Sequence, residues 1–372
     1  MSEIRLTGVT KQFGSLRAVD RVDLDVAAGE VMCLLGPSGC GKTTTLRMIA
    51  GLERATAGDI LIAGRRVNDL PARARNVAMT FQFYALYPSL TVAENLAYPL
   101  HADGLDRAAI AARIADVARV LDLEGILARR PHQLGEGEKQ RVAVGRSIVR
   151  QPTCFLFDEP LSRLDIQLRQ QMRTQIKEVL ERLDKPTVIV THDQIEALTM
   201  ADRIAVMRDG RIAQVATPHD LFAQPADTFV AGFIGTPQMN LLPATLADAA
   251  PVGPDGPDGP GGAVARFAVL GGALAATAPA AVRQLAPGSA VTLGIRPRSF
   301  LPASQDAPGA LAATVDLIEP MGAEMLLHLV REGADLRCVV PHTTRIAAGE
   351  TVGLCCKPGQ LHVFDAAGVR VA

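Results

Sequence analysis

The sequence predicts an α/β fold built on a parallel sheet, followed by a small all-β barrel domain. The apolar runs at residues 31–35, 153–157 and 187–191 are typical of buried parallel strands. A glycine-rich turn joins the first of these runs to a helical segment at residues 43–50. After about residue 235, short β-like runs separated by Gly and Pro replace the helical patterns.

Length and composition limit the classes of protein that fit this chain. A chain of 372 residues is too long for one ordinary core, so we expect two or three domains. The net charge of −1 gives no basic footprint for nucleic acid, which we do not expect as a partner. The six cysteines show no C-x-x-C spacing, which favours a reduced, cytosolic chain.

Neither of the two segments that could direct the chain to a membrane has the necessary composition. Residues 1–10 carry charge and no apolar signal core. The most membrane-like stretch, residues 263–282, contains Arg266 and Pro279 and is too weakly apolar to span a bilayer. We therefore expect any membrane role to come through partners.

Residues 4–9 and 22–26 alternate apolar and polar positions on either side of a turn at Phe13-Gly14, which predicts a small antiparallel sheet. Phe13 is expected to be exposed in that turn. An exposed ring there could stack on a purine, or it could simply pack at the strand end, and the residues alone favour neither alternative.

Residues 36–43 fit the phosphate-binding pattern G-x-x-x-x-G-K-[ST] in full, between a strand and a helix as the motif requires. The glycines let backbone N–H groups converge on phosphate oxygens, and the helix N-terminus adds its positive dipole end. Lys42 supplies a mobile charge, and the Thr43 hydroxyl can hold Mg2+. The predicted nucleotide site comprises Gly36, Pro37, Ser38, Gly39, Cys40, Gly41, Lys42, Thr43 and Thr44.

Two later strands deliver charged side chains to the same edge of the predicted sheet. Asp158 and Glu159 follow the run at residues 153–157, and His192 follows the run at residues 187–191. Asp158 can hold Mg2+, while Glu159 orients or deprotonates the attacking water. His192 is expected to contact phosphate. The alternatives are that the acids cap a following helix and that the histidine is structural.

A strand predicted at residues 77–81 ends at Gln82 and leads into an aromatic loop. This loop gathers Tyr84, Leu86 and Tyr87 beside a proline. An exposed patch of this kind indicates a protein contact, the alternative being burial under a neighbouring helix.

Residues 106–123 predict an amphipathic helix. The apolar side chains recur at helical spacing on one face, and most arginines lie elsewhere. We therefore expect a helical subdomain inserted at about residues 88–150. The apolar face consists of Ile110, Ile114, Val117 and Leu121.

The C-terminal part predicts a separate β domain. Residues 251–262 are almost all turn formers, which predicts a mobile surface loop at about residues 250–262. The regular spacing of the β-like runs beyond this loop favours a small barrel. The runs lie at residues 290–295, 311–318, 325–330, 336–340, 351–356 and 360–364.

With these residues in hand, the chain closely resembles the ATP-binding subunits of ABC importers, in the subgroup that serves maltose-type sugars and glycerol-3-phosphate. The resemblance covers essentially the whole chain. Its motifs are residues 36–43 as Walker A, Phe81-Gln82 as the Q-loop, residues 155–160 as Walker B, residues 161–165 as the D-loop and residues 191–194 as the switch. The subgroup is indicated by residues 230–235, 294–297 and 361–365.

The resemblance implies a P-loop NTPase fold with a RecA-like core, an antiparallel β subdomain and the inserted helical subdomain, in an ATP-binding domain at residues 1–235. An OB-like regulatory or dimerisation domain follows at residues 236–372. The implied cofactors are ATP and Mg2+. Phe13 would stack on adenine, Gln82 would link Mg2+ and water to the permease contact, and His192 would touch the γ-phosphate.

The resemblance also implies partners and a location. The partners would be two membrane permease subunits and an extracytoplasmic solute-binding protein, with the chain peripheral on the cytoplasmic face of the bacterial inner membrane. The surface at Tyr84, Leu86 and Tyr87 would receive a coupling helix of the permease. The solute is not disclosed, because its specificity lies in the permease and binding protein.

The segment that should grip ATP bound to the opposite subunit departs from the family pattern. The family reads Leu-Ser-Gly-Gly-Gln, whereas this chain reads Leu134-Gly135-Glu136-Gly137-Glu138. An acid about 5 Å from a phosphate charge costs about 3 kcal/mol at an effective dielectric constant of about 20. The trans-dimer residues implied by the resemblance are Gly135, Gly137 and Asp165.

Three interpretations of this departure follow. The first is that a homodimer is a weak ATPase and that a heterodimer with an intact partner subunit keeps one competent site. The second is a slow but working homodimer in which Lys139 and Arg141 offset the acids. The third is a regulatory subunit that binds ATP with little turnover, which the intact Glu159 and His192 disfavour.

A soluble ABC protein acting on ribosomes or DNA is the alternative from another class. Such a protein would usually need two cassettes in one chain, and this sequence has one phosphate loop and no evident basic face.

Overall fold

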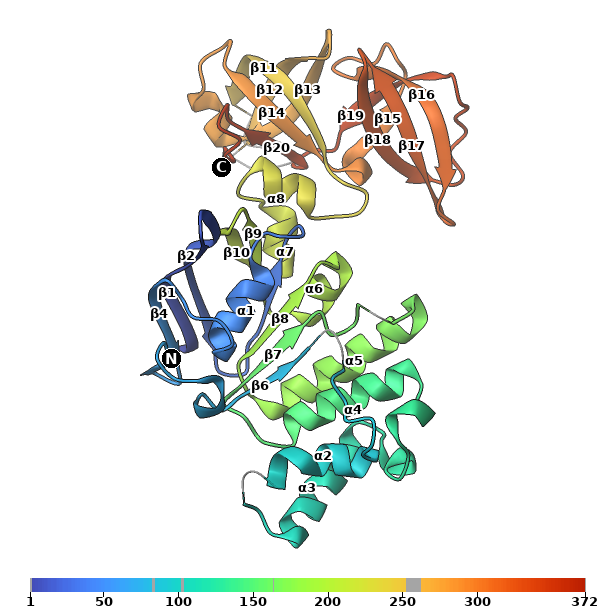
Figure 1. The fold of residues 1–372 in the computed structure, drawn as a ribbon. Coiled ribbons are helices and arrows are strands. Elements are labelled where there is room, and N and C mark those ends of the chain that lie inside the picture. Colours follow the sequence, from blue (N-terminus) through green and yellow to red (C-terminus); the bar gives the residue numbers. More distant parts are fainter. Residues whose placement is uncertain (1, 82–83, 102–103, 163, 252–261, 372) are drawn as a thin grey trace. The chain divides into compact units, whose positions relative to one another are not determined.

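The computed structural model describes residues 2–81, 84–101, 104–162, 164–251 and 262–371 (Figure 1). Its internal contacts divide the chain into two compact units, Met1–His219 and Asp220–Ala372. Residues 220–235 therefore group with the second unit, although the sequence analysis assigned them to the ATP-binding domain. Most of the loop expected at residues 250–262 lies outside the described residues.

A six-stranded sheet with the order β10-β9-β3-β8-β7-β6 forms the centre of the first unit. β3, β7 and β8 are buried at every position, which explains their apolar sequences. Only β10 runs antiparallel to its neighbour. The strands are β3 (Val31–Leu35), β6 (Val77–Thr80), β7 (Cys154–Asp158), β8 (Thr187–Thr191), β9 (Arg203–Arg208) and β10 (Arg211–Ala216).

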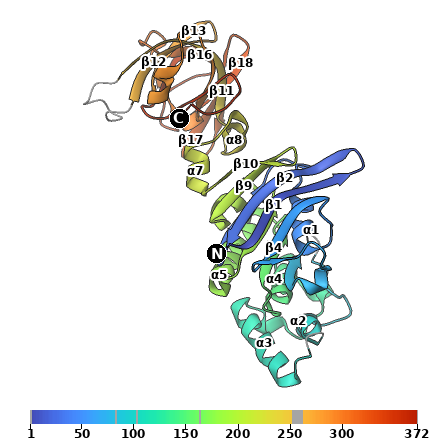
Figure 2. The ribbon, with the colours of Figure 1, turned by 90° about the vertical axis from the view of Figure 1, so that its left-hand side faces the viewer.

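A four-stranded antiparallel sheet with the order β2-β1-β4-β5 lies along one side of the first unit, as Figure 2 shows for β1, β2 and β4. Its apolar face shares one buried cluster with helix α1 and the six-stranded sheet. This sheet confirms the predicted antiparallel subdomain. Its elements are β1 (Ser2–Phe13), β2 (Leu16–Ala27), β4 (Ala57–Ile62) and β5 (Arg65–Arg66), with α1 at Lys42–Ala50.

Helices α2, α3 and α4 form the inserted helical part of the first unit, and α2 and α3 lie at its end opposite β9 and β10 (Figure 1). Asp106 begins α3 by accepting a hydrogen bond of 2.7 Å from the Ala109 N–H, and Ile110 is buried on the expected face. The first unit contains α2 (Val92–His101), α3 (Arg107–Val120), α4 (Glu136–Ile148), α5 (Ile166–Leu183) and α6 (Gln194–Met200), with short 3-10 turns at Ala72–Ala74, Glu124–Ile126 and Pro131–Gln133.

The second unit is mostly antiparallel sheet, in two five-stranded sheets with the orders β13-β12-β11-β14-β20 and β15-β19-β16-β17-β18. One continuous buried cluster joins the two sheets, which confirms the predicted OB-like all-β architecture. The strands are β11 (Asn240–Pro251), β12 (Gly262–Val269), β13 (Gly272–Pro279), β14 (Ala290–Ile295), β15 (Phe300–Ala303), β16 (Leu311–Pro320), β17 (Glu324–Arg331), β18 (Ala334–Pro341), β19 (Thr351–Cys356) and β20 (Leu361–Phe364).

Short helices complete the second unit. α8 (Thr228–Phe233) precedes β11, and α7 (Pro218–Ala223) begins at the division between the units. Two 3-10 turns, Ala280–Gln284 and Pro297–Ser299, flank β14. In the part of the chain that the structure describes, no helix is both long enough and apolar enough to cross a membrane.

The core of the second unit supplies a first prediction. Phe267 of β12 is fully buried, so Phe267→Ala should lower the free energy of unfolding of this unit by about 3–5 kcal/mol, through lost burial and the cavity left behind. Val264 lies on the same strand and is 46% exposed, so Val264→Ala should cost less than about 0.5 kcal/mol. Urea unfolding followed by circular dichroism compares the two. Equal effects would contradict the shared core.

Candidate nucleotide site

The loop between β3 and α1 is packed closely against neighbouring backbone. Gly41 has a φ of 103°, and a Cβ atom at this position would lie 2.5 Å from the Ala18 carbonyl oxygen. A Cβ atom at Gly36 would lie 2.3 Å from the Met207 carbonyl oxygen. Both approaches are too short for any side chain. The loop therefore requires glycine at these two positions to hold its shape.

Lys42 lies inside this loop and is 6% exposed. Its ammonium nitrogen donates hydrogen bonds of 2.8 Å to the carbonyl oxygens of Gly36 and Pro37. The Cys40 sulfur, also buried, lies 3.7 Å from the same nitrogen. A positive charge is thus held where the backbone and the N-terminus of α1 converge, which is the arrangement suited to phosphate.

Thr43 and Asp158 bring two oxygen donors together from adjacent elements. The Thr43 hydroxyl donates a hydrogen bond of 3.1 Å to the Asp158 carboxylate at the end of β7. Burial raises the pKa of Asp158, while the Thr43 hydrogen bond and nearby cations oppose this shift. Mg2+ favours oxygen ligands and is commonly held by one or two protein oxygens together with phosphate and water. The pair fits such an ion.

Glu159 and His192 meet at the same edge of the sheet. The His192 Nδ1 atom lies 3.0 Å from a Glu159 carboxylate oxygen. Glu159 has a φ of 49°, a left-handed conformation that is strained for a non-glycine residue, and its N–H donates to the Val190 carbonyl. This strained turn directs the carboxylate toward the loop. Both residues line a cavity of about 210 Å³ together with Ala18, Ser38, Gly39, Gly41, Lys42, Thr43 and Thr44.

Several residues expected at the nucleotide lie elsewhere or have other partners. Phe13 ends β1, is 46% exposed and does not line the cavity, and the Lys11 ammonium nitrogen lies 4.6 Å from its ring centroid. Asp165 begins α5, where its carboxylate accepts a hydrogen bond of 3.0 Å from the Leu168 N–H. Gln82 lies outside the described residues.

Arg169 connects the predicted D-loop to the predicted switch, and the sequence analysis missed it. Its guanidinium pairs with Asp193 at 3.0 Å and donates to the Leu164 carbonyl oxygen at 2.9 Å. Asp193 in turn accepts backbone hydrogen bonds at the start of α6. No pattern along α5 distinguishes this arginine, because its ion-pair partner Asp193 lies 24 positions further along the chain.

Glu196 is a buried acid in α6, close in sequence to His192. It is 2% exposed and accepts a hydrogen bond of 2.7 Å from the Thr191 hydroxyl. Its other carboxylate oxygen has no hydrogen-bond partner among the described residues. Burial raises the pKa of Glu196 from 4.5 to about 7. The folded chain therefore favours the protonated acid at pH values below about 7.

Because Glu196 holds its proton more tightly in the folded chain, its contribution to stability is fully present below pH 4.5 and is lost as the pH rises toward about 7. Glu196→Gln should reduce this pH-dependent loss in the free energy of unfolding by up to about 3 kcal/mol. Urea unfolding followed by tyrosine fluorescence measures it, since all three tyrosines lie in the first unit. The exposed Glu181→Gln is the control. If the free energy of unfolding varies with pH in the same way for Glu196→Gln and the unsubstituted chain, the raised pKa of Glu196 is contradicted.

Residues 134–138, which depart from the family pattern, lie at the N-terminus of α4. Both glutamates of this segment have partners within the same chain. The Glu138 carboxylate accepts a hydrogen bond of 2.8 Å from the Gly135 N–H and lies 3.8 Å from the Arg129 guanidinium. Glu136 pairs with Lys139 at 2.7 Å. A Cβ atom at Gly137 would lie 2.8 Å from a Leu168 methyl carbon, so this glycine allows α4 and α5 to pack closely.

The aromatic loop is held against α2 and α4 by residues that the sequence analysis did not identify. The fully buried Asn95 side chain makes hydrogen bonds to both backbone groups of Tyr87. The ring centroids of Tyr87 and Tyr98 lie 4.5 Å apart. The Arg146 guanidinium donates hydrogen bonds to the carbonyl oxygens of Ala85 and Tyr84. Tyr87 is 40% exposed, while Tyr84 and Leu86 are half-buried.

Comparison with known proteins identifies the class of this fold and site. The family model for the ABC transporter matches residues 19–162, and that for the TOBE domain matches residues 293–364. A dimeric structure of a post-hydrolysis state of the ATP-binding cassette MJ0796, bound to ADP and Pi, covers 58% of this chain and 98% of its own, with 29% identity and a TM-score of 0.52. The chain belongs to the ABC transporter family, as an ATP-hydrolysing subunit that energises an importer.

The relatives place the chain within one branch of that family. It is 45% identical over 373 residues, all of both chains, to the sn-glycerol-3-phosphate import ATP-binding protein UgpC of Paraburkholderia xenovorans. It is 47% identical over 370 residues, 99% of this chain and 98% of the other, to the protein of the same name from Burkholderia thailandensis. The resemblance stated from the motifs is thereby confirmed.

Proposed function

We propose that this chain hydrolyses Mg2+-ATP to drive import of glycerol-3-phosphate or a sugar-like solute. The observation that carries the proposal is one cavity that gathers Lys42, Thr43, Glu159 and His192, with Asp158 hydrogen-bonded to Thr43. The solute class comes from relatives of almost equal length that are named for import of glycerol-3-phosphate.

In the proposed mechanism the loop and Lys42 hold the phosphates of ATP. Thr43 and Asp158 would hold Mg2+, which would neutralise part of the phosphate charge. Glu159 accepts a proton from the attacking water while the water oxygen forms a bond to the γ-phosphorus and the bond to the ADP oxygen breaks. His192, 3.0 Å from the Glu159 carboxylate, keeps that acid oriented and contacts the γ-phosphate. Gln82 is expected to assist at the metal and the water.

The proposed partners follow from the partly exposed aromatic loop and from the dimeric neighbours in the family. Tyr84, Leu86 and Tyr87 would receive a permease subunit, and two ATPase subunits would close over ATP. An extracytoplasmic binding protein would deliver the solute, and the chain would lie peripherally on the cytoplasmic face of the bacterial inner membrane. The domain limits at residues 235 and 236, the adenine contact of Phe13 and the trans contact of Asp165 belong to the same proposal.

The catalytic assignment predicts the effect of Glu159→Gln. The amide keeps the shape of the side chain but cannot accept the proton of water, so ATP hydrolysis should fall by about 100-fold or more while ATP binding is kept. Phosphate release and nucleotide binding are measured on the same preparations. Glu181→Gln, an exposed acid on α5, is the matched control and should keep full activity. If Glu159→Gln keeps more than about half of the activity, the acid is not the base.

The segment 134–138 decides whether two copies of this chain can share ATP. The Glu138 carboxylate already accepts a hydrogen bond from the Gly135 N–H, which a phosphate from the opposite subunit would use. The negative charge of Glu138 would also repel that phosphate. We therefore propose that this segment is a weak trans partner and that a second ATPase subunit with an intact segment completes one site. The pairing of Glu136 with Lys139 supports the alternative of a slow homodimer, because it offsets one of the acids.

Restoring the segment tests this proposal. In a Glu159→Gln background, which blocks hydrolysis, the chain should show little dimer by light scattering with ATP and Mg2+. The triple change Gly135→Ser, Glu136→Gly and Glu138→Gln should produce an ATP-dependent dimer. Gln at position 138 can still cap the helix, so the change removes charge without removing the cap. An ATP-dependent dimer without the triple change would overturn the heterodimer proposal.

A further inference from the structure

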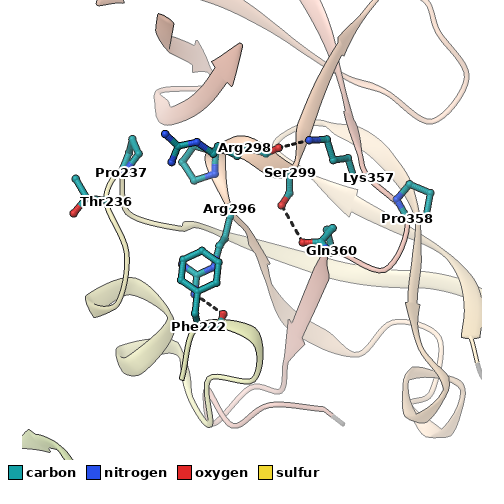
Figure 3. A pocket seen from close by; sticks show the side chains of 10 residues that line it. Phe222, Thr236, Pro237, Arg296, Arg298, Ser299, Lys357, Pro358 and Gln360 are labelled. Atoms are coloured by element: carbon teal, nitrogen blue, oxygen red, sulfur yellow. Dashed lines mark hydrogen bonds between the residues drawn. The ribbon is translucent and has the colours of Figure 1, made fainter. Parts of the chain in front are cut away.

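A second cavity lies within the C-terminal unit, next to the strand ends of β14 and β19 (Figure 3). Its volume is about 460 Å³, within the range of small-molecule sites. Three cationic side chains line it, Arg296, Arg298 and Lys357, and none of its lining residues is an acid. Its remaining wall is largely Phe222 and prolines. The cavity thus combines positive charge with apolar surface.

Arg296 is a buried cation that has no carboxylate partner among the described residues. It is 7% exposed, and its guanidinium lies 3.5 Å from the Phe222 ring centroid. It donates to the carbonyl oxygens of Ile234 and Phe222, at 2.8 and 2.7 Å, while its Nε atom has no hydrogen-bond partner in the described part of the chain. No ion pair of Arg296 occurs among those residues either. Buried charges are normally paired, so this one requires an explanation.

The other two cations differ in their partners. Arg298 pairs with Glu324 through two hydrogen bonds, which neutralise its charge. Lys357 donates only to the Arg298 carbonyl oxygen, at 2.7 Å, and has no ion pair within the described ranges (Figure 3). Two positive charges, on Arg296 and Lys357, therefore remain uncompensated at the cavity. The pKa of His362, lowered to about 4 by burial and then by the charges of Arg296 and Arg370, is consistent with a positive field here.

Arg296 also has a structural role, because its two carbonyl contacts tie residues 222 and 234 to the start of the turn after β14. Those contacts would be equally available to a neutral donor and leave the charge unexplained. They also do not account for Lys357, which is half-buried and whose ammonium group makes one hydrogen bond among the described residues, to a backbone carbonyl oxygen. An anion in the cavity would explain both charges at once.

We propose that this cavity binds a small organic anion of the phosphomonoester class. A phosphomonoester carries close to two negative charges at neutral pH, which matches the two uncompensated cations. Ser299 and Thr236 supply neutral polar groups, and Phe222 and the prolines offer apolar surface for the carbon portion. The proposal concerns the second unit alone and does not depend on the ATPase assignment.

The chain contains no tryptophan, so Phe222→Trp places a single fluorophore in the cavity wall. Glycerol phosphate should change its emission in a saturable way, with a Kd at or below about 1 mM. Inorganic phosphate should bind more weakly, and glycerol or NaCl at equal ionic strength should give no saturation. A Lys42→Ala background should leave the signal intact, which separates it from the phosphate loop. Calorimetry on the Lys42→Ala chain serves as the readout if Phe222→Trp does not fold.

Charge variants in the Phe222→Trp background locate the site. Lys357→Gln should weaken binding about tenfold. The double variant Arg298→Gln with Glu324→Gln keeps the overall charge and should have a smaller effect, because that pair is already neutral. Arg345→Gln removes the charge of an exposed arginine that does not line the cavity and should change nothing.

Three results would overturn the proposal. The first is no saturable change with glycerol phosphate up to about 10 mM. The second is equal binding by the Lys357→Gln and Arg345→Gln variants, which would indicate general screening. The third is binding of inorganic phosphate at least as tight as that of glycerol phosphate, which would exclude the organic-anion assignment.

Discussion

The close approach of backbone to backbone at the phosphate loop is the constraint on which the first unit depends. Gly36 and Gly41 bring the loop within contact of the carbonyl groups of Met207 and Ala18, so β9 and β2 fix where the loop can lie. The parallel order of β3, β8 and β7 then places the residues after each strand at one edge. Lys42, Asp158 and His192 are neighbours because of this register, although they are far apart in sequence.

The same helix-end chemistry explains both the nucleotide site and the departure at residues 134–138. At α1 the free N-terminus and Lys42 leave a place for an anion, whereas at α4 the Glu138 carboxylate accepts the Gly135 N–H. A side-chain acid is held there at no cost in association entropy, so in the proposed dimer a phosphate from another subunit would have to displace it. In that proposal, the affinity of the two subunits for each other would depend on competition between this phosphate and the Glu138 carboxylate of the same chain.

Local patterns were sufficient for the motifs and for the strongly apolar strands, but not for the alanine-rich strands or for long-range polar partners. β3, β8, β14 and β19 have the limits expected from their apolar runs. The strands β11, β12 and β13 were not predicted, because their many alanines and flanking prolines weaken the β pattern. In the structure they pair with one another, and β11 pairs with β14. Asn95 and Arg146 were also missed: Arg146 contacts a loop about 60 positions earlier, a relation that no local spacing encodes.

The two anion sites, one assigned to nucleotide and one proposed, differ in how they would respond to pH. Burial lowers the pKa of Arg296 only to about 10, so its guanidinium stays charged at every physiological pH. Occupancy of the second cavity would therefore follow the ionisation of the ligand, whose second proton is lost near pH 6. A monoanion would leave one of the two cations uncompensated. In this proposal a dianion would bind more tightly than a carboxylate because it carries a charge for each of the two cations. The apolar wall at Phe222 would favour a ligand that also has a carbon portion.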